Sequence, residues 1–384
     1  MVNAMWIAAV AVLTGLLSYR ILIGRIPWTN RRPKDPPTTE GAVSVVICAR
    51  DAARALQRHL PHVLAQDHPH AEVIVVDDGS TDETADVLRR LSAHHDMLRI
   101  VRLHPADRPD LPGKRAPLLT GLRAARHARV VLTDADCRPA STTWLRRMAA
   151  SSADIVIGLS PYAPARGLVA PLVALETLQA AQLTGAAAAR GQAYTAVGRN
   201  LATHRDLLLD WLTHARHTTA SGDDDLFVQQ VAHRSTIDLC AHPDAFTISD
   251  PPGDLRAWLR QKRRHLSTAS RYSPAAAAYA GLWTFLHLAW SVLWVAGGWA
   301  LPVLVFVQIV RAAWTTVTTP SAFRAGQHIV FFLWMLLIEP FFWVIYVTLS
   351  LTVRAQRPLG WDAPHGGSRT HSAHPRGEGP EGVR

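Results

Sequence analysis

The chain of 384 residues is long for one catalytic domain, and with 48% hydrophobic and 18% charged residues it is more apolar than a soluble enzyme needs. Its formal net charge of +10 favours an anionic partner, and since no nucleic-acid-binding motif is present, we expect a nucleotide diphosphate or membrane lipids and no nucleic acid. The three cysteines form no CxxC pair and the 19 histidines form no HExxH pattern, which excludes zinc sites of those kinds.

An apolar run from about Ala4 to Ile26 opens the chain. A cleaved signal peptide carries positive charge before its apolar run, whereas here Arg20 and Arg25 lie at the end of the run. Residues 1–27 are therefore predicted to be an uncleaved transmembrane anchor that leads into the cytoplasm. The proline-rich residues 28–42 are predicted to be a stiff linker.

Short β-branched runs alternate with helical stretches across residues 43–253, which predicts an α/β domain with a mostly parallel sheet covered by helices on both faces. The sequence Ser80 to Glu83 has the pattern of a capping box. Strands are predicted at Val43–Ala49, Glu72–Val76, Leu98–Leu103, Arg129–Leu132 and Asp154–Gly158, and helices at Ala53–Gln66, Ser80–Leu91, Arg115–His127 and Thr142–Ala150.

The last third of the chain returns to apolar sequence. Residues 254–273 are predicted to form an amphipathic helix at the membrane surface, and residues 275–353 about three spans, with one break near residues 297–298 and the third span from about residue 328. The tail 354–384 is predicted to be disordered. With the anchor, this indicates a multi-pass protein of the inner (cytoplasmic) membrane with a cytoplasmic catalytic domain.

Glu339 and Pro340 interrupt the last predicted span. A carboxylate within a membrane is a candidate functional group. A structural explanation is equally open, in which Pro340 bends the helix and Glu339 faces the other helices. The sequence alone does not distinguish the functional interpretation of Glu339 from the structural one.

Two pairs of carboxylates follow predicted strands. Asp77 and Asp78 end the second strand, and Asp134 and Asp136 follow the fourth. In a doubly wound sheet the ligand crevice lies beyond the carboxyl ends of the strands, and side chains two apart on an extended segment point the same way. We therefore expect a site for Mg²⁺ or Mn²⁺ and substrate phosphates here, although a helix cap and a solvated loop are the structural alternatives.

Three adjacent carboxylates, Asp223, Asp224 and Asp225, form the next candidate group. A carboxylate whose pKa is raised by like-charged neighbours is a suitable general base. The alternative is an acidic first turn that stabilises the helix dipole. Both readings place the group at the start of a helix.

The helix predicted over residues 254–273 carries basic groups around an apolar face that includes Trp258. One reading places it on anionic lipid headgroups. The other has Gln261, Arg264 and His265 line the active site, and both can hold for one helix.

These four groups, in this order, resemble the motifs of the membrane-bound family 2 glycosyltransferases, which have a GT-A fold and carry an Asp pair, a DxD-like motif, a Glu/Asp-Asp motif and a (Q/R)xxRW motif. The resemblance covers about residues 37–272. The corresponding residues here are Asp77-Asp78, Asp134-Ala135-Asp136, Asp223-Asp224 and Gln261-Lys262-Arg263-Arg264-His265, with Gly113-Lys114 and Gly198-Arg199-Asn200 as smaller matching segments.

The resemblance implies an inverting transfer of a sugar from a nucleotide-diphosphate sugar, with UDP favoured, to a lipid-linked or glycan acceptor in cell-envelope synthesis. Asp224, with Asp223 or Asp225 as substitutes, would be the catalytic base. Asp134 and Asp136 would hold Mg²⁺ or Mn²⁺. Substrate binding would involve Asp77, Asp78, Lys114, Arg199, Asn200, Gln261, Arg264 and His265. Nothing in the sequence indicates the oligomeric state.

One position departs from the family pattern, because His265 stands where the Trp of the fourth motif is expected. This disfavours a processive polysaccharide synthase, which is kept as an alternative together with an inactive membrane scaffold that retains the fold. A nucleotidyltransferase would not need the third acidic group followed by a basic helix. A P-loop kinase is excluded because Gly113-Lys114 lacks the flanking residues of that motif.

Overall fold

The computed structural model describes residues 11–12, 14–15, 41–165, 167, 169–214, 222–296, 301–324 and 328–353. Apart from the four positions before residue 16, the predicted N-terminal anchor lies outside the described residues. The same holds for the linker up to residue 40 and for the predicted tail from residue 354.

Seven strands form one mixed sheet in the order β3-β2-β1-β4-β7-β6-β8. Strand β7 is antiparallel to its neighbours β4 and β6, and all other neighbouring strands are parallel. The strands are β1 (Val43–Ala49), β2 (Ala71–Asp77), β3 (Leu98–Arg102), β4 (Arg129–Asp134), β6 (Ile155–Gly158), β7 (Leu201–His204) and β8 (Ile237–Cys240), and a separate antiparallel pair joins β5 (Cys137–Pro139) to β9 (Thr247–Ser249).

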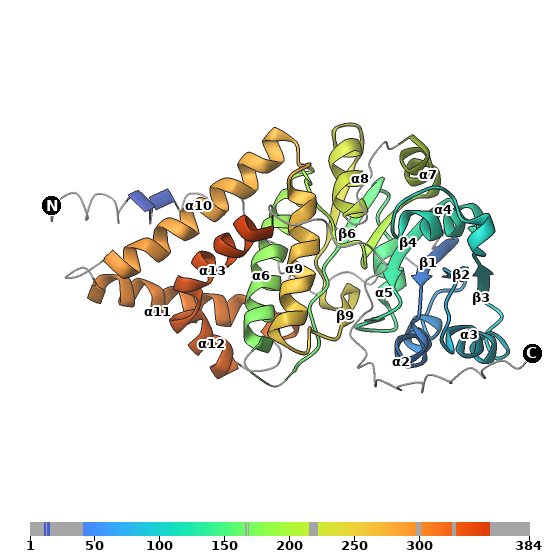
Figure 1. Cartoon of the computed structure of the whole chain (residues 1–384), viewed down its shortest axis with the longest axis horizontal. Coiled ribbons are helices and arrows are strands. Elements are labelled where there is room, and N and C mark those ends of the chain that lie inside the picture. The colour runs from blue at the N-terminus through green and yellow to red at the C-terminus, as the bar shows by residue number, and fades with distance from the viewer. Residues whose placement is uncertain are drawn as a thin grey trace, which may run out of the picture.

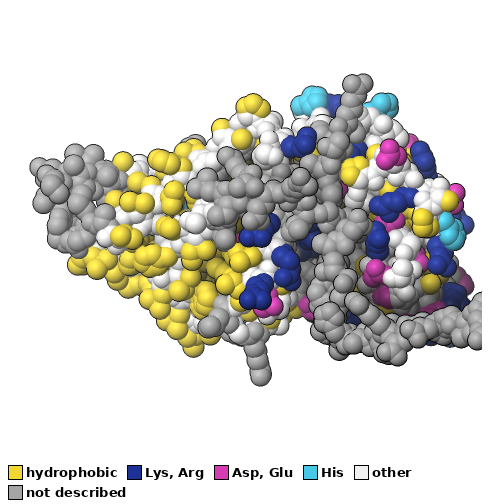
Figure 2. Space-filling view, in the orientation of Figure 1, with side chains coloured by type: hydrophobic (Ala, Val, Ile, Leu, Met, Phe, Trp, Pro, Cys, Tyr) yellow, Lys and Arg dark blue, Asp and Glu magenta, His cyan; other side chains and the backbone are white. Residues whose placement is uncertain are grey.

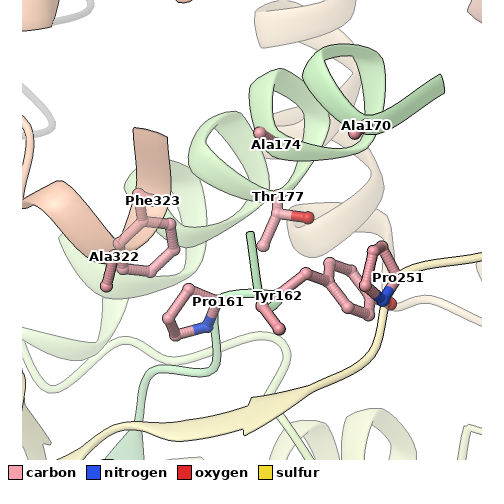
Figure 3. Close-up of a pocket in the computed structure, with 9 residues that line it drawn as sticks. Pro161, Tyr162, Ala170, Ala174, Thr177, Pro251, Ala322 and Phe323 are labelled. Atoms are coloured by element: carbon pink, nitrogen blue, oxygen red, sulfur yellow. The ribbon is translucent and has the colours of Figure 1, made fainter. Parts of the chain in front are cut away.

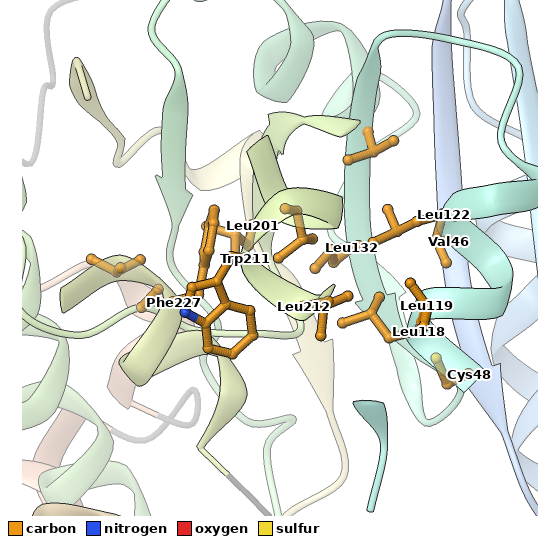
Figure 4. Packing of buried hydrophobic residues seen from close by; sticks show 14 of the residues in the cluster. Val46, Cys48, Leu118, Leu119, Leu122, Leu132, Leu201, Trp211, Leu212 and Phe227 are labelled. Carbon is orange, nitrogen blue, oxygen red and sulfur yellow. The ribbon is translucent and has the colours of Figure 1, made fainter. Parts of the chain in front are cut away.

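Helices cover both faces of the sheet (Figure 1), which confirms the predicted α/β class. One buried cluster joins β1, β2 and β4 to α4, α7 and α8, and Figure 4 shows Leu119, Leu132 and Phe227 within it. A second cluster joins the opposite face to α2, α3 and α5. The bounds are α2 (Ala53–Leu64), α3 (Thr84–Ser92), α4 (Arg115–Ala124), α5 (Trp144–Ala149), α7 (Arg205–His214) and α8 (Asp223–Val231).

The register of the central strands brings their carboxyl ends to one edge. Ala49 at the end of β1 lies opposite Asp77 of β2, and Cys48 lies opposite Asp134 of β4. Every residue of β1 is buried, because a central parallel strand is covered on both faces. The apolar strands thus place their polar end residues together at this edge.

The predicted capping box is wrong. Helix α3 begins at Thr84, so Glu83 occupies the N-cap position and Ser80 lies outside the helix. The Ser80 hydroxyl instead accepts a hydrogen bond from the Asp51 amide at 3.0 Å, and Asp82 accepts one from the Thr84 amide at 3.0 Å. Local side-chain bonds of this kind compete with a longer helix.

Two helices connect the α/β domain to the apolar end of the molecule. Helix α6 (Val169–Ala188) and helix α9 (Leu255–Ala269) stand between these two parts in Figure 1. Glu176 of α6 joins them, because it accepts a hydrogen bond from the Trp258 indole at 3.0 Å and forms an ion pair with Lys262. Trp258 is fully buried, so the apolar face of α9 packs within the protein at this point.

Helices α10 (Pro274–Ala296), α11 (Leu301–Thr318), α12 (His328–Leu337) and α13 (Glu339–Val353) make up the apolar end, where Figure 2 shows hydrophobic side chains over much of the surface. Among the described residues, Pro274–Val295 and Leu301–Thr318 are long and apolar enough to cross a membrane. The third predicted span is instead two helices, α12 and α13, bent by 66° at their junction.

The bend between α12 and α13 follows from the sequence at residues 338–340. Helix α13 begins at Glu339, so Pro340 occupies its first turn, where the missing amide hydrogen costs nothing. Glu339 is buried among the helices, and Arg311, Gln308 and Gln179 donate hydrogen bonds to its carboxylate at 2.7, 3.0 and 3.4 Å. The structure therefore shows Glu339 facing the helical bundle, as one of the two sequence readings had it.

Candidate active site

The first acidic pair lies at the carboxyl end of β2, and both residues are buried. Asp77 turns back to accept the Ser80 amide at 3.0 Å, which closes the turn through Gly79. Asp78 forms an ion pair with Arg108 through Oδ1. Its Oδ2 is buried without a hydrogen-bond partner among the described residues. A buried acceptor of this kind needs a donor, so Asp78 is suited to bind a ligand group.

Arg108 lies in the loop between β3 and α4, and sequence reasoning did not identify it as a site residue. Its guanidinium bridges Asp78 and the carbonyl oxygen of Gly113, which it reaches at 2.9 Å. Arg108 thus fixes the residue that precedes Lys114, whose side chain pairs with Asp134. Arg108 directly follows the short 3-10 helix η1 (Pro105–Asp107), and no periodic pattern in the sequence marked it.

The second acidic group follows β4. Side-chain ligand atoms of Asp134, Asp136 and Cys137 lie within 4.8 Å of one another. Lys114 forms an ion pair with Asp134. Burial alone would raise the pKa of the Asp134 carboxyl, but the Lys114 ammonium outweighs it and holds that pKa below its usual value. The two carboxylates are hard oxygen donors, and they fit Mg²⁺ or Mn²⁺ better than a soft metal ion.

Charges from several segments act on this same point. The positive charges of Arg199 and Arg264 lower the pKa of Asp134, and Asp134 and Asp224 raise that of Lys114. The structure thus brings together residues from β4, from the start of α4 and α8, and from α9. A nucleotide diphosphate carries the charge that such a set of cations binds.

The three aspartates at the start of α8 point to different partners. Asp223 lies 3.8 Å from the buried guanidinium of Arg115. Asp224 accepts a hydrogen bond from the Gly198 amide at 2.7 Å. Asp225 accepts hydrogen bonds from the Thr195 hydroxyl and, at 2.6 Å, from the Tyr272 hydroxyl. Asp225 is therefore held by side chains outside the Lys114 region, unlike Asp224.

Burial raises the pKa values of all three carboxyl groups. The pKa of Asp223 rises to about 7, through burial first and the charge of Asp224 second. The pKa of Asp224 is also raised by burial, although the Gly198 amide opposes the effect. A carboxylate with a raised pKa accepts a proton more readily, which suits Asp224 to a general base.

Arg199 lies in the segment that directly precedes β7. Its guanidinium donates hydrogen bonds to the Ser160 hydroxyl at 2.6 Å and to the Tyr162 hydroxyl at 3.3 Å, and it stacks over the Tyr162 ring at 4.6 Å. Gln261 of α9 donates to the same Tyr162 hydroxyl at 2.8 Å. Tyr162 thus joins two predicted site residues, and sequence reasoning did not identify it.

Asn200 does not face this group. It is fully buried, and its side chain accepts a hydrogen bond from the Trp144 indole at 2.9 Å and donates to the carbonyl oxygens of Leu159 and Ala245, both at 2.8 Å. These three bonds use its amide to join α5 to the ends of β6 and the η3 turn (Pro243–Ala245).

His265 follows Arg264 on α9, one helical turn after Gln261. Partial loss of hydration, together with the charges of Lys262 and Arg264, lowers the pKa of its imidazole, although the side chain is exposed at the surface.

A small apolar crevice lies beside Tyr162, between α6 and the η5 turn (Ser321–Arg324) that precedes α12. Figure 3 shows Thr177 of α6 above Tyr162, with Phe323 to the left and Pro251 to the right. Tyr162 is thus shared between this crevice and the group that contains Arg199 and Gln261.

The comparisons with known proteins follow this geometry. The model of the family described as "Glycosyltransferase like family 2" matches residues 40–268, more than half of the chain. Glycosyltransferase AglE of Haloferax volcanii is 34% identical over 107 residues, which cover 27% of this chain and 33% of AglE. The poly-beta-1,6-N-acetyl-D-glucosamine synthase of Staphylococcus epidermidis is 28% identical over 94 residues, which cover 24% of this chain and 21% of the synthase. The matched stretches thus span only about a fifth to a third of these relatives.

Among solved structures, the mannosyltransferase PcManGT of Pyrobaculum calidifontis, determined with GDP-Man and Mn²⁺, superimposes with a TM-score of 0.55 at 22% identity. The superposition covers 91% of this chain and 97% of PcManGT, and it shows a shared GT-A fold over almost the full length. Taken with the family match, these findings show that the chain belongs to glycosyltransferase family 2 and has its GT-A fold.

Proposed function

We propose that the protein transfers a sugar, with inversion, from a nucleotide-diphosphate sugar to the hydroxyl of a lipid-linked or glycan acceptor at the cytoplasmic face of the inner membrane. The observation that carries this proposal is the position of Asp224. Its carboxylate is fixed by the Gly198 amide, has a raised pKa and acts electrostatically on Lys114, which pairs with Asp134. A proton acceptor and a binding site for diphosphate thus lie together, as the reaction requires.

The donor would lie along the carboxyl edge of the sheet. Asp78, with its unpartnered buried oxygen, would accept a hydrogen bond from the base or ribose, with Asp77 closing the turn beneath it. Lys114 and Arg264 would bind the diphosphate. We favour UDP as the nucleotide.

Asp134 and Asp136 would hold Mg²⁺ or Mn²⁺, which supplies positive charge to the leaving diphosphate when it is bound. PcManGT was solved with Mn²⁺, and the oxygen donors here suit either ion. Lys114 would change partners when the donor binds, since its present partner is Asp134. Asp224 would then take the proton from the acceptor hydroxyl as this attacks the anomeric carbon, and burial keeps its pKa high for that role.

A lipid-linked acceptor is supported by the position of Tyr162 next to apolar side chains of α6 and of the η5 turn. Arg199, Gln261 and His265 would bind the polar end of the acceptor, and its lipid part would lie along the candidate spans. Transfer of one or a few sugars is favoured over long polymers because His265 replaces the expected Trp.

The test is transfer and donor hydrolysis by the detergent-purified full chain across a panel of nucleotide-sugars, with Mg²⁺, with Mn²⁺ and with EDTA. We expect nucleotide release from one donor, lost with EDTA and in Asp136→Ala. The length of the product on a lipid-linked acceptor distinguishes single addition from processive synthesis. Absence of both nucleotide release and calorimetric binding across the whole panel would contradict the proposal and favour an inactive scaffold.

A further inference from the structure

Helix α8 contacts the turn that joins α9 to α10 at two points, one in its first turn and one in its second. The Tyr272 hydroxyl donates to Asp225 Oδ2 at 2.6 Å, and the Ser273 amide donates to Gln229 Oε1 at 2.8 Å. Asp225 and Gln229 are four residues apart and so lie on one face of α8. That face is thereby fixed against the two residues that precede α10.

The loop before β7 holds α8 from another side. Asp225 Oδ1 accepts the Thr195 hydroxyl and, at 3.4 Å, the Ala196 amide, and Asp224 Oδ2 accepts the Gly198 amide at 2.7 Å. Each carboxylate oxygen of Asp225 thus has a partner on a different segment. Asp225 links this loop to the turn before α10.

Aromatic contacts also link the loop before β7 to the turn before α10. The ring of Tyr194 lies edge-on to Tyr272, with centroids 6.1 Å apart, and edge-on to Tyr279 of α10 at 5.2 Å. The Tyr279 hydroxyl donates to the carbonyl oxygen of Leu183 on α6 at 3.3 Å. The two tyrosines therefore belong to one cluster of edge-on rings, in which the Tyr272 hydroxyl bonds to α8 and the Tyr279 hydroxyl to α6.

We infer that Tyr272 is a positioning residue for the catalytic base. Its hydroxyl orients the carboxylate of Asp225, which sets the first turn of α8 and so holds Asp224 where it removes the acceptor proton. This inference rests on the proposed role of Asp224. It also ties the base to α10, the first candidate span among the described C-terminal helices.

Removal of the hydroxyl leaves Asp225 with two of its three donors, both on the loop side. Helix α8 then keeps its Gln229 contact with the turn before α10 but loses the contact at its first turn. The donor-side residues Asp78, Lys114 and Asp134 keep their contacts. A hydrogen bond to a charged acceptor is among the stronger ones in proteins. The loss should therefore reduce proton transfer and leave donor binding intact.

The experiment compares Tyr272→Phe with Tyr279→Phe in the full chain. Each variant loses one phenolic hydroxyl from the same cluster of rings and keeps its ring. We expect kcat to fall about tenfold in Tyr272→Phe, with the KM and Kd of the donor unchanged and the melting temperature within about 4 °C of the wild type. Tyr279→Phe should keep the wild-type kcat.

A double-mutant cycle with Asp225→Asn completes the test, and the single Asp225→Asn variant serves in place of Tyr272→Phe if the latter does not fold. Both substitutions act on one bond, so the double variant should lose no more activity than the worse single variant. Wild-type kcat in the folded Tyr272→Phe protein, an equal fall in Tyr279→Phe, or additive losses would each overturn the inference. A wild-type rate in Asp224→Asn would instead overturn the proposed function, whatever Tyr272→Phe does.

Discussion

The three consecutive aspartates of α8 have the same chemistry but different surroundings. Asp223 faces the buried Arg115, Asp224 faces the Gly198 amide, and Asp225 is held by Thr195 and Tyr272. Successive residues of a helix are rotated by about 100° from one another, so each side chain reaches a different wall. This separation is why Asp224, rather than its neighbours, is suited to meet an acceptor.

Gly198 determines how closely the backbone approaches Asp224. A Cβ atom at Gly198 would lie 2.9 Å from Asp224 Oδ2 and 3.1 Å from its Cγ, so a side chain would push the carboxylate away. We expect Gly198→Ala to lower kcat at least about tenfold with little change in the donor Kd. Gly253→Ala is the control, because a Cβ there meets nothing within 4 Å. Equal kinetics in the two variants would show that Asp224 does not depend on this contact.

A substitution at Arg108, the partner of Asp78, tests the proposed binding site for the sugar donor. Arg108→Met removes the partner of a buried carboxylate and disturbs the Gly113-Lys114 segment, so the donor KM should rise about tenfold or more while kcat changes less. Arg58→Met removes an arginine whose ion pair with Asp250 is largely exposed, and it should leave KM unchanged. Steady-state kinetics over a range of donor concentrations measures both. A fall in kcat with unchanged KM in Arg108→Met would exclude this role.

The sequence located the residues that end apolar strands more readily than those in irregular segments. Asp77 and Asp134 follow buried runs, and the parallel register brings them to one edge. Arg108 and Tyr162 lie on loops whose path depends on tertiary contacts, so no periodic pattern marked them. Asn200 matched a family segment, yet its amide serves internal hydrogen bonds that only the fold reveals.

At the scale of elements, the five strand predictions were confirmed with small shifts at their ends, because each of these strands contains an apolar, β-branched run. Strands β5, β7, β8 and β9 are three or four residues long, too short for a visible alternation. Helix α6 was not predicted either. It is buried along most of its length, so it has no polar face to give a helical period.

The start of α8 predicts a specific pH dependence. Asp224 must be ionised to accept a proton. We therefore expect kcat to reach its maximum above the raised pKa of Asp224 and to fall as the pH drops through that value. Burial raises the pKa of Asp224 and the charge of Lys114 opposes that rise, so Lys114→Met should raise the pKa of Asp224 further and move the acid limb of the kcat profile to higher pH.

The control for this profile is Asp206→Asn on α7, whose carboxylate is mostly exposed and pairs with Arg205. Its acid limb should coincide with that of the wild type. The measurement is kcat against pH at saturating donor and metal ion. An unchanged limb in Lys114→Met would mean that another group controls the rate.

At the scale of the whole molecule, the catalytic domain and the apolar helices are joined by polar contacts. Gln179 of α6 and Arg311 of α11 both donate to Glu339 at the bend between α12 and α13. Trp258 and Lys262 of α9 both contact Glu176 of α6. Composition predicted an apolar region of about three spans, but the sequence did not reveal these contacts, because they join residues far apart in the chain.

The Glu339 contacts predict a defined loss of stability. Arg311→Met leaves the buried carboxylate of Glu339 without its charged partner, which should destabilise the protein by about 3 kcal/mol. Adding Glu339→Gln removes the unpaired charge and should restore much of the loss. Thermal unfolding in detergent measures both variants. If the double variant loses the sum of the two single effects, the pair does not act as a unit.

The central claim is that Asp224 is the base of a sugar transfer, and Asp224→Asn tests it most directly. The amide nearly preserves the shape of the carboxylate but does not accept a proton, so the variant should bind the donor with a Kd close to that of the wild type and transfer no measurable sugar. Donor calorimetry and product formation on the same detergent-purified protein give both values. Transfer at the wild-type rate by Asp224→Asn would contradict the account.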